Sequence, residues 1–298
     1  MSSAGAPSWG GRPSADAPLG VFDSGLGGLT VVRALRAALP DERIVYLGDT
    51  ARVPYGTRSA ETVVRYARGC ARLLTEQHGV KALVVACNTV SAVALEMLRA
   101  ELDLPVLGVV EPGARAALEA FQGLQASRRP VPPKIGVLGT AGTIRSGAYP
   151  RAVAQLTTRV EVLGQAAPLL VPLAEEGWLE GQVPELAARR YLEPLITQGA
   201  SVILLGCTHY PLLSKVIASV AEALAGAPVA VVDSAAATAA AVARWTEEER
   251  IAPAPARPEA RHLKLLVTDL PASFGSVAAR FLGATEAGPD LDVEQVDL

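Results

Sequence analysis

The chain has 298 residues, and at roughly 150 residues per domain this length predicts about two domains. Hydrophobic residues make up 50% of the chain and charged residues 19%, so the composition excludes intrinsic disorder for most of it. Lys and Arg number 27 against 30 Asp and Glu, and no basic run predicts a nucleic-acid partner. The apolar stretches have the length of strands, and the N-terminus lacks the pattern of a secretory signal, so we expect no membrane association.

Cysteine is sparse in this chain. Its three cysteines, Cys70, Cys87 and Cys207, are too few and too widely spaced to predict a disulfide framework. No CxxC or HxxxH pair predicts a zinc site. We therefore expect free thiols, no bound metal and a location in the reducing cytoplasm.

Residues 1–18 are rich in Gly, Pro, Ser and Ala and are predicted to form a flexible tail. Beyond them, short apolar runs alternate with longer stretches of helical periodicity. The apolar runs predict strands at residues 19–22, 43–47, 82–86, 106–110, 134–138, 160–163, 202–205, 229–232 and 263–267. The periodic stretches predict helices at residues 30–38, 60–77, 91–100, 147–155, 184–197, 211–224 and 235–250. This alternation is typical of an α/β protein whose mostly parallel sheets are covered by helices on both faces.

The pattern repeats once along the chain. Apolar strands ending in small polar residues open both halves, at residues 20–24 and 136–140, and later strands end in cysteine turns at residues 83–89 and 203–209. The repeat predicts two similar doubly wound α/β domains related by pseudo-symmetry, with the active site between them. We assign residues 19–110 plus 222–298 to the first domain and residues 111–221 to the second. Residues 125–133 and 251–259 are predicted surface loops.

Polar side chains gather where the predicted strands end. They are Asp23, Ser24, Asp49, Tyr55, Gly56, Cys87, Asn88, Thr89, Glu111, Thr140, Cys207, Thr208, His209, Asp233 and Ser234. Ligands of open parallel sheets bind at the carboxyl ends of the strands, so this set predicts a ligand site.

A dinucleotide site is one interpretation of the first of these turns. Gly25, Gly27 and Gly28 follow a strand and precede a helix, and Asp49 at the next strand end resembles a ribose-binding acid. However, Asp23 would repel a pyrophosphate, and the last glycine of the fingerprint is missing. The glycines are equally explained by a tight strand-to-helix turn.

The cysteines differ in their surroundings. Cys70 lies within a predicted helix, which favours a packing role. Cys87 and Cys207 each follow a strand and precede a helix, whose N-terminus is expected to lower the thiol pKa below about 8.5. His209 stands two residues after Cys207 and is predicted to tune it as an acid or base.

Two carboxylates have alternative interpretations. Asp23 either serves Cys87 or caps the following helix. Asp49 is either a site residue or a partner of Arg52 in a loop salt bridge.

Several reaction classes remain for this set of residues. A Cys-His-Asp hydrolase leaves the second cysteine without a role. Pyridoxal chemistry needs a Schiff-base lysine, whereas all lysines of the chain stand before strands or on helices, at Lys81, Lys134, Lys215 and Lys264. Two thiols facing one ligand instead allow one to remove a proton from a stereocentre and the other to return a proton to the opposite face, without a cofactor.

Several motifs of the chain, in order, resemble those of the glutamate racemases in the aspartate/glutamate racemase family. They stand at residues 20–30, 46–49 with 54–56, 86–89, 109–113, 171–177 and 206–212, within a resemblance that covers roughly residues 19–285. One departure is Ala167, at a place where the family often has a cysteine outside the catalytic pair.

The resemblance implies cofactor-independent interconversion of L- and D-glutamate, which supplies D-glutamate for peptidoglycan. It implies that Cys87 takes the proton from D-glutamate and Cys207 from L-glutamate, assisted by Asp23 and His209. The implied substrate contacts are Asp23, Ser24, Tyr55, Gly56, Asn88, Thr89, Thr208 and His209. The lesser candidates are Asp49, Glu175 and Thr140.

The resemblance also leaves alternatives. Family members often pair as homodimers. Aspartate racemase is the nearest alternative, although it usually has Glu where His209 stands and lacks the Asp-Ser-Gly opening. A non-catalytic amino-acid-binding protein of the same fold is a further alternative, against which the presence of both thiols argues.

Overall fold

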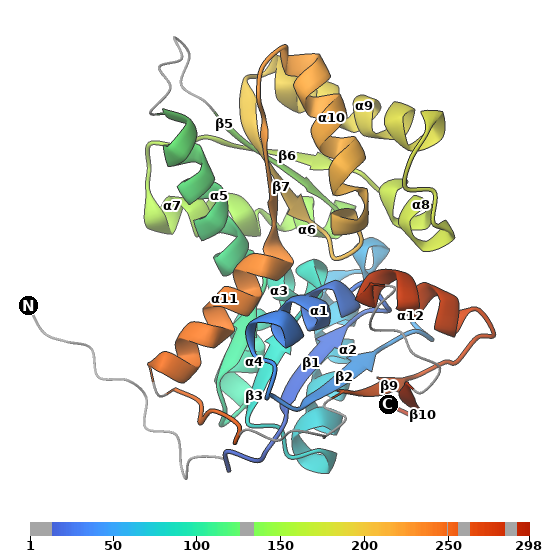
Figure 1. Cartoon of the computed structure of the whole chain (residues 1–298). Coiled ribbons are helices and arrows are strands. Elements are labelled where there is room, and N and C mark those ends of the chain that lie inside the picture. The colour runs from blue at the N-terminus through green and yellow to red at the C-terminus, as the bar shows by residue number, and fades with distance from the viewer. Residues whose placement is uncertain (1–13, 126–133, 249, 256–262, 284–290) are drawn as a thin grey trace, which may run out of the picture.

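The structure, a computed structural model, describes residues 14–125, 134–248, 250–255, 263–283 and 291–298. These residues form two parallel β-sheets, each carrying helices and lying one above the other in Figure 1. The larger sheet has six strands in the order β10-β9-β2-β1-β3-β4, and the smaller has four in the order β6-β5-β7-β8. The predicted α/β class with parallel sheets is confirmed.

The first sheet consists of β1 (Leu19–Asp23), β2 (Ile44–Gly48), β3 (Ala82–Val85), β4 (Val106–Gly108), β9 (Leu263–Val267) and β10 (Asp292–Gln295). Its two faces are buried by different helices. One face packs against α1 (Leu29–Ala38), α11 (Ser234–Glu247) and α12 (Phe274–Leu282). The other packs against α2 (Ala60–Arg72), the π-helical turn Leu73–Gln77, α3 (Asn88–Val93) and α4 (Leu95–Glu101). Alternate residues of β1 therefore enter different cores, with Val21 on one side and Phe22 on the other.

The second sheet consists of β5 (Lys134–Gly139), β6 (Val162–Ala166), β7 (Ala200–Gly206) and β8 (Ala230–Asp233). Helices α5 (Val110–Gln125) and α7 (Ala148–Leu156) cover one face. Helices α8 (Leu170–Glu176), α9 (Gln182–Thr197) and α10 (Ser214–Ala225) cover the other. The short helix α6 (Ala141–Ser146) follows β5 at the carboxyl end of the strand.

The chain returns to the first sheet later than the sequence indicated. The expected boundary at residue 222 falls inside α10, whereas β8 still pairs with β7 in the second sheet. Parallel neighbours need a crossover between them, so α10 and β8 stay with β7 as one βαβ unit. The return is made at α11, which begins at Ser234.

The start of the described chain is held against the first sheet. Lys81 Nζ forms a buried ion pair with Glu42 and donates to the carbonyls of Ala15 (3.2 Å) and Ala252 (2.7 Å). Residues 14–18 are therefore anchored, contrary to the expected flexible tail, while residues 1–13 lie outside the described residues. Of the two predicted loops, only residues 125 and 251–255 are described.

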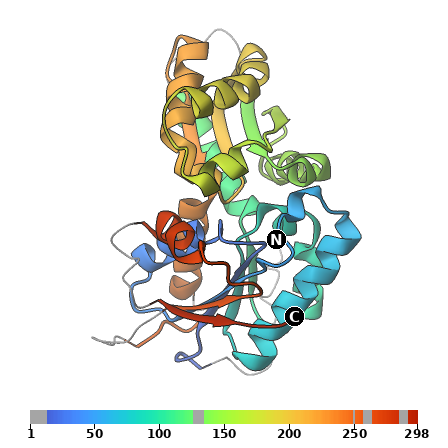
Figure 2. The same ribbon diagram turned by 90° about the vertical axis from the view of Figure 1, so that its right-hand side faces the viewer.

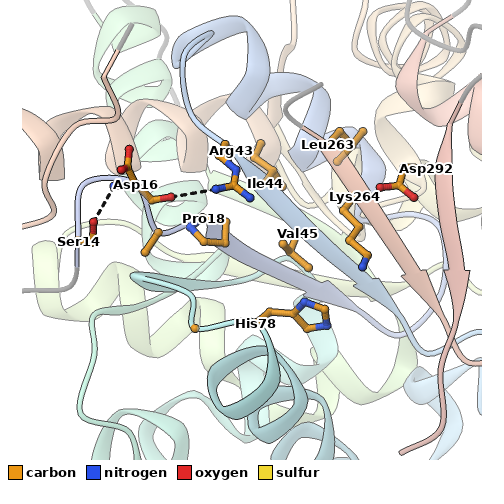
Figure 3. A pocket seen from close by; sticks show the side chains of 12 residues that line it. Ser14, Asp16, Pro18, Arg43, Ile44, Val45, His78, Leu263, Lys264 and Asp292 are labelled. Carbon is orange, nitrogen blue, oxygen red and sulfur yellow. Dashed lines mark hydrogen bonds between the residues drawn. The ribbon is translucent and has the colours of Figure 1, made fainter. Parts of the chain in front are cut away.

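Residues 14–18 also border a pocket of about 500 Å³ at the amino ends of β1, β2 and β9 (Figure 3). Arg43, His78 and Lys264 line it, and Arg43 Nη1 donates to the Asp16 carbonyl at 3.3 Å. None of the predicted site residues lines this pocket. The functional candidates belong to the opposite, carboxyl ends of the strands.

Strand β10 and helices α5, α6, α8 and α12 have no counterpart among the predicted elements. Strand β10 is an edge strand of sequence DVEQ whose residues are mostly exposed, so no apolar run marks it. Figure 2 shows β9 and β10 together on the lower, larger unit. Within the part of the chain that the structure describes, no helix is both long and apolar enough to span a membrane.

Candidate active site

The polar turns of the two sheets contact each other. We call each sheet with its covering helices a unit. Asn88 Nδ2 in the first unit donates to the Tyr149 hydroxyl of the second unit at 2.7 Å. The hydroxyls of Thr89 and Thr140 lie 3.0 Å apart. Thr30 Oγ1 donates to the Thr208 carbonyl at 3.1 Å. The carboxyl ends of β1, β3, β5 and β7 therefore meet at one place between the sheets.

Glycine permits this close approach at two positions. A Cβ at residue 27 would lie 2.3 Å from Thr208 Oγ1 and 2.5 Å from His209 Nδ1. A Cβ at residue 56 would lie 2.6 Å from Thr140 Cβ. The space that a pyrophosphate would need at the first turn is thus filled by the Cys207 turn. The glycines form the tight strand-to-helix turn, which the sequence offered as the alternative to a dinucleotide site.

Cys87 stands between β3 and α3 and is buried. Its thiol donates to Ser24 Oγ at 3.5 Å. Burial raises the pKa of this thiol to about 12, and the charge of Asp23 adds to the rise, while Ser24 and the Val90 amide oppose it. The expectation of a lowered pKa is therefore wrong for Cys87, because desolvation outweighs the end of a six-residue helix.

Cys207 follows β7 and is equally buried. Its sulfur lies 3.9 Å from His209 Nδ1, and the other ring nitrogen, Nε2, lies 2.9 Å from Glu175 Oε1. Burial lowers the pKa of His209, but its hydrogen bonds to Cys207 and Glu175 and the charges of both outweigh burial and raise that pKa to about 10. At neutral pH the imidazole is therefore a cation, and its positive charge lies beside the Cys207 sulfur.

Asp23 ends β1 as a fully buried carboxylate. Its Oδ2 accepts the Gly25 amide at 3.1 Å, and Gly28 rather than Asp23 is the N-cap of α1. Burial raises the pKa of Asp23, against the lowering effects of the His209 charge and of backbone amides. Two buried oxygens, Asp23 Oδ1 and Asn88 Oδ1, have no hydrogen-bond partner among the described residues. Both are free to accept hydrogen bonds from a ligand.

The Asp/Glu/Hydantoin racemase family profile matches residues 29–242. A curated glutamate racemase from Geobacter metallireducens is 47% identical over 280 residues, covering 94% of this chain and 96% of that protein. The chain belongs to the Asp/Glu/hydantoin racemase family. It is accordingly an isomerase of the racemase class.

Solved racemases share its fold. Glutamate racemase from Thermus thermophilus in complex with β-chloro-D-alanine matches this racemase with a TM-score of 0.78 at 44% identity, covering 95% of this chain and 98% of the other. Glutamate racemase from Francisella tularensis in complex with D-glutamate matches with a TM-score of 0.80 at 32% identity, over the same shares of the two chains.

The carboxylate of Asp49 in this racemase is hydrogen-bonded by neighbouring side chains. It accepts hydrogen bonds from the Tyr55 hydroxyl, from Arg52 Nε (2.7 Å) and from Thr268 Oγ1 (2.8 Å). The salt bridge to Arg52, offered as one interpretation of Asp49, is present. Because the Tyr55 hydroxyl is held by Asp49, the structure gives Asp49 the task of fixing the Tyr55–Thr57 turn, whose Gly56 contacts Thr140.

Two carboxylates of the polar set are engaged by other protein groups. Glu111 forms a bidentate salt bridge with Arg99, whose Nη1 and Nη2 donate to Oε1 at 2.8 Å and to Oε2 at 3.0 Å. Asp233 caps α11 by accepting the Ala235 amide at 2.8 Å. Both follow strands, as the sequence indicated, but each is used by a neighbouring helix or by an arginine. Cys70 is fully buried in α2, in agreement with a packing role.

Several residues at the racemase site carried no signal in the sequence. Tyr149 reaches Asn88 from α7, and Thr143 lies 3.4 Å from Thr89. From α12, Arg280 donates to the Glu175 carbonyl, and the Phe281 ring lies against His209. These contacts join segments distant in sequence, which local patterns do not reveal.

Proposed function

We propose that this racemase interconverts L- and D-glutamate, with Cys87 and Cys207 as the two acid/base groups on opposite sides of the substrate α-carbon. The supporting observation is the placement of the thiols. Each is buried at the carboxyl end of a strand in one of two facing sheets, and each has a polar partner, Ser24 or His209. Glutamate is supported by the names of the relatives and by the D-glutamate complex of the Francisella protein.

The two thiols differ in their electrostatic surroundings. From this difference we infer which thiol acts as the acid and which as the base before substrate binds. The raised pKa of Cys87 keeps its proton on sulfur at neutral pH, which makes it an acid. The cationic His209 is held by Glu175 and lies 3.9 Å from the Cys207 sulfur, and this neighbouring positive charge favours Cys207 as the base. This state is ready to take the α-proton of L-glutamate at Cys207 and to deliver a proton from Cys87, giving D-glutamate. The reverse direction starts from the opposite pair of protonation states.

Hydrogen-bonding side chains and backbone amides would bind the substrate. We propose that Asp23 Oδ1 and Asn88 Oδ1, two buried acceptors of this site without a partner among the described residues, receive the α-ammonium group. The proposed contacts to the carboxylates are Ser24, Tyr55, Gly56, Thr89, Thr208 and His209, with Thr140 as a lesser candidate beside Thr89. Hydrogen bonds from such groups also stabilise the α-carboxylate as it takes on enediolate character.

The proposal includes a biological role. D-glutamate made by this enzyme would supply peptidoglycan synthesis and so maintain the cell wall and cell shape. A cytoplasmic location is supported by the three cysteines, all of which are free thiols. A homodimer is part of the same proposal and rests on the resemblance alone.

We expect purified protein to racemise both enantiomers of glutamate without pyridoxal phosphate, metal or nucleotide, because the two thiols supply both proton transfers. Circular dichroism followed from each enantiomer should decay to the same zero signal. EDTA treatment should leave the rate unchanged, and activity lost to EDTA and restored by metal would contradict the proposal. Aspartate is the matched control substrate, and equal turnover of aspartate would favour an aspartate racemase.

His209→Asn should affect the two directions unequally, because His209 contacts Cys207 and not Cys87. We expect the primary deuterium isotope effect to rise with α-deuterated L-glutamate, since abstraction by Cys207 becomes more rate-limiting. With α-deuterated D-glutamate it should fall, since reprotonation by Cys207 then limits the rate. The equilibrium constant still requires kcat/KM to fall equally in both directions. Equal changes in both isotope effects would remove the assignment of His209 to Cys207.

A further inference from the structure

Helix α12 belongs to the first unit and contacts the His209–Glu175 pair of the second unit. Its Phe274, Ala278, Phe281 and Leu282 are buried in the first core with α1 and α11. In Figure 1 this helix, at the red end of the colour scale, lies on the side of the lower unit nearest α8. Arg280 crosses between the units, and its Nη1 donates to the main-chain carbonyl of Glu175.

The guanidinium of Arg280 binds at the C-terminal end of α8. Glu175 lies in the last turn of that helix, where carbonyl groups lack partners within the helix, and a cation is favourable there. Gly177 follows with φ +78°, and a Cβ at this position would lie 2.9 Å from the guanidinium of Arg280. The guanidinium therefore packs directly on the backbone that carries Glu175.

A second contact comes from the next residue of α12. The Phe281 ring meets the His209 ring edge to face, with centroids 5.1 Å apart and planes at 79°. Arg280 thus binds the backbone of Glu175, and the Phe281 ring packs against the His209 ring. His209 Nε2 in turn lies 2.9 Å from Glu175 Oε1. All three interactions converge on the imidazole beside Cys207.

We propose that Arg280 and Phe281 are positioning residues for the His209–Glu175 pair and thereby for proton transfer at Cys207. This inference rests on the proposed function. The contacts of both residues lead to Glu175 and His209, so their effect passes through the imidazole. The Glu175 side chain is 41% exposed, so water competes with His209 for its carboxylate. The hydrogen bond from Arg280 to the Glu175 carbonyl fixes the backbone that directs this carboxylate toward His209.

Arg280→Met tests the proposal, because it removes the donor and leaves the buried face of α12 intact. We expect kcat for L-glutamate to fall about threefold to tenfold, as for the loss of one hydrogen bond, with a smaller change in KM. The isotope effect should rise with α-deuterated L-glutamate and fall with the D enantiomer, the same signature as His209→Asn. Arg280→Lys, which keeps a donor for the Glu175 carbonyl, should recover most of the lost kcat.

A double-variant comparison separates positioning from general loss of structure. In a Glu175→Ala background, Arg280→Met should change kcat by less than about twofold, because its route to His209 is already gone. Phe281→Leu should give the same isotope signature as Arg280→Met and serves as a second variant if Arg280→Met does not fold. Arg72→Met, at an exposed pair between the end of α2 and Glu76 of the π-helical turn, is the matched control and should leave kcat unchanged.

The outcomes distinguish this proposal from the proposed function. Failure of the unaltered protein to racemise glutamate would overturn the function itself, and this proposal with it. If the unaltered protein is active, equal isotope changes in both directions for Arg280→Met and Phe281→Leu, or multiplicative losses with Glu175→Ala, would overturn the positioning role alone.

Discussion

Replacing either Cys87 or Cys207 with alanine is expected to abolish racemisation of glutamate. Inversion needs a base on one side of the α-carbon and an acid on the other, and each variant removes one of them. Near neutral pH a serine hydroxyl is a much poorer proton shuttle than a thiol, so Cys87→Ser and Cys207→Ser should not restore turnover. The measurement is the rate from each enantiomer, with far-UV circular dichroism to confirm that the variants fold.

Cys70→Ala provides the matched control, because Cys70 is also a buried cysteine of the first unit but packs in α2. It should keep its activity and lose only about 1 kcal/mol of stability, as for a small buried side chain. A folded Cys87→Ala or Cys207→Ala protein with near-normal turnover would contradict the two-thiol mechanism.

Lys81→Met is expected to cost the largest stability of any single change considered for this protein. Lys81 and Glu42 are only 1% and 3% exposed, with Nζ 2.7 Å from Glu42 Oε2. Removing the lysine leaves an unpaired buried carboxylate, a loss of about 3–5 kcal/mol in the free energy of unfolding. It also frees the carbonyls of Ala15 and Ala252, so the two segments that carry these carbonyls should loosen. Urea unfolding measures the change.

Two further variants make this stability measurement specific. Lys264→Met breaks the solvent-accessible Lys264–Glu294 pair on β9 and β10 and should cost far less stability than Lys81→Met, because water screens this pair. The double variant Lys81→Met with Glu42→Leu removes both charges and should recover much of the loss. If Lys81→Met and Lys264→Met unfold at the same urea concentration, the buried pair does not stabilise the fold as proposed.

Sequence patterns predicted the buried strands and most long helices of this protein. Strand β7, for example, is a continuous apolar run because helices cover both of its faces, and such a run is visible in the sequence itself. The cysteine turns were equally visible, since a residue that directly follows a strand must lie at its carboxyl end. Strand β10 was missed because an exposed edge strand needs no apolar side chains.

What the sequence determined by itself is therefore local: the strand runs, the helical periods and the pairing of each cysteine with a strand end. The tertiary structure decided which distant groups meet, as in the Asn88–Tyr149, Glu175–His209 and Arg280–Glu175 contacts. It also decided the pKa of the Cys87 thiol. A helix N-terminus after Cys87 suggested a lowered pKa, but the full burial that raises it depends on packing from several elements. Desolvation is a property of the whole surrounding volume, and chain neighbours alone do not specify it.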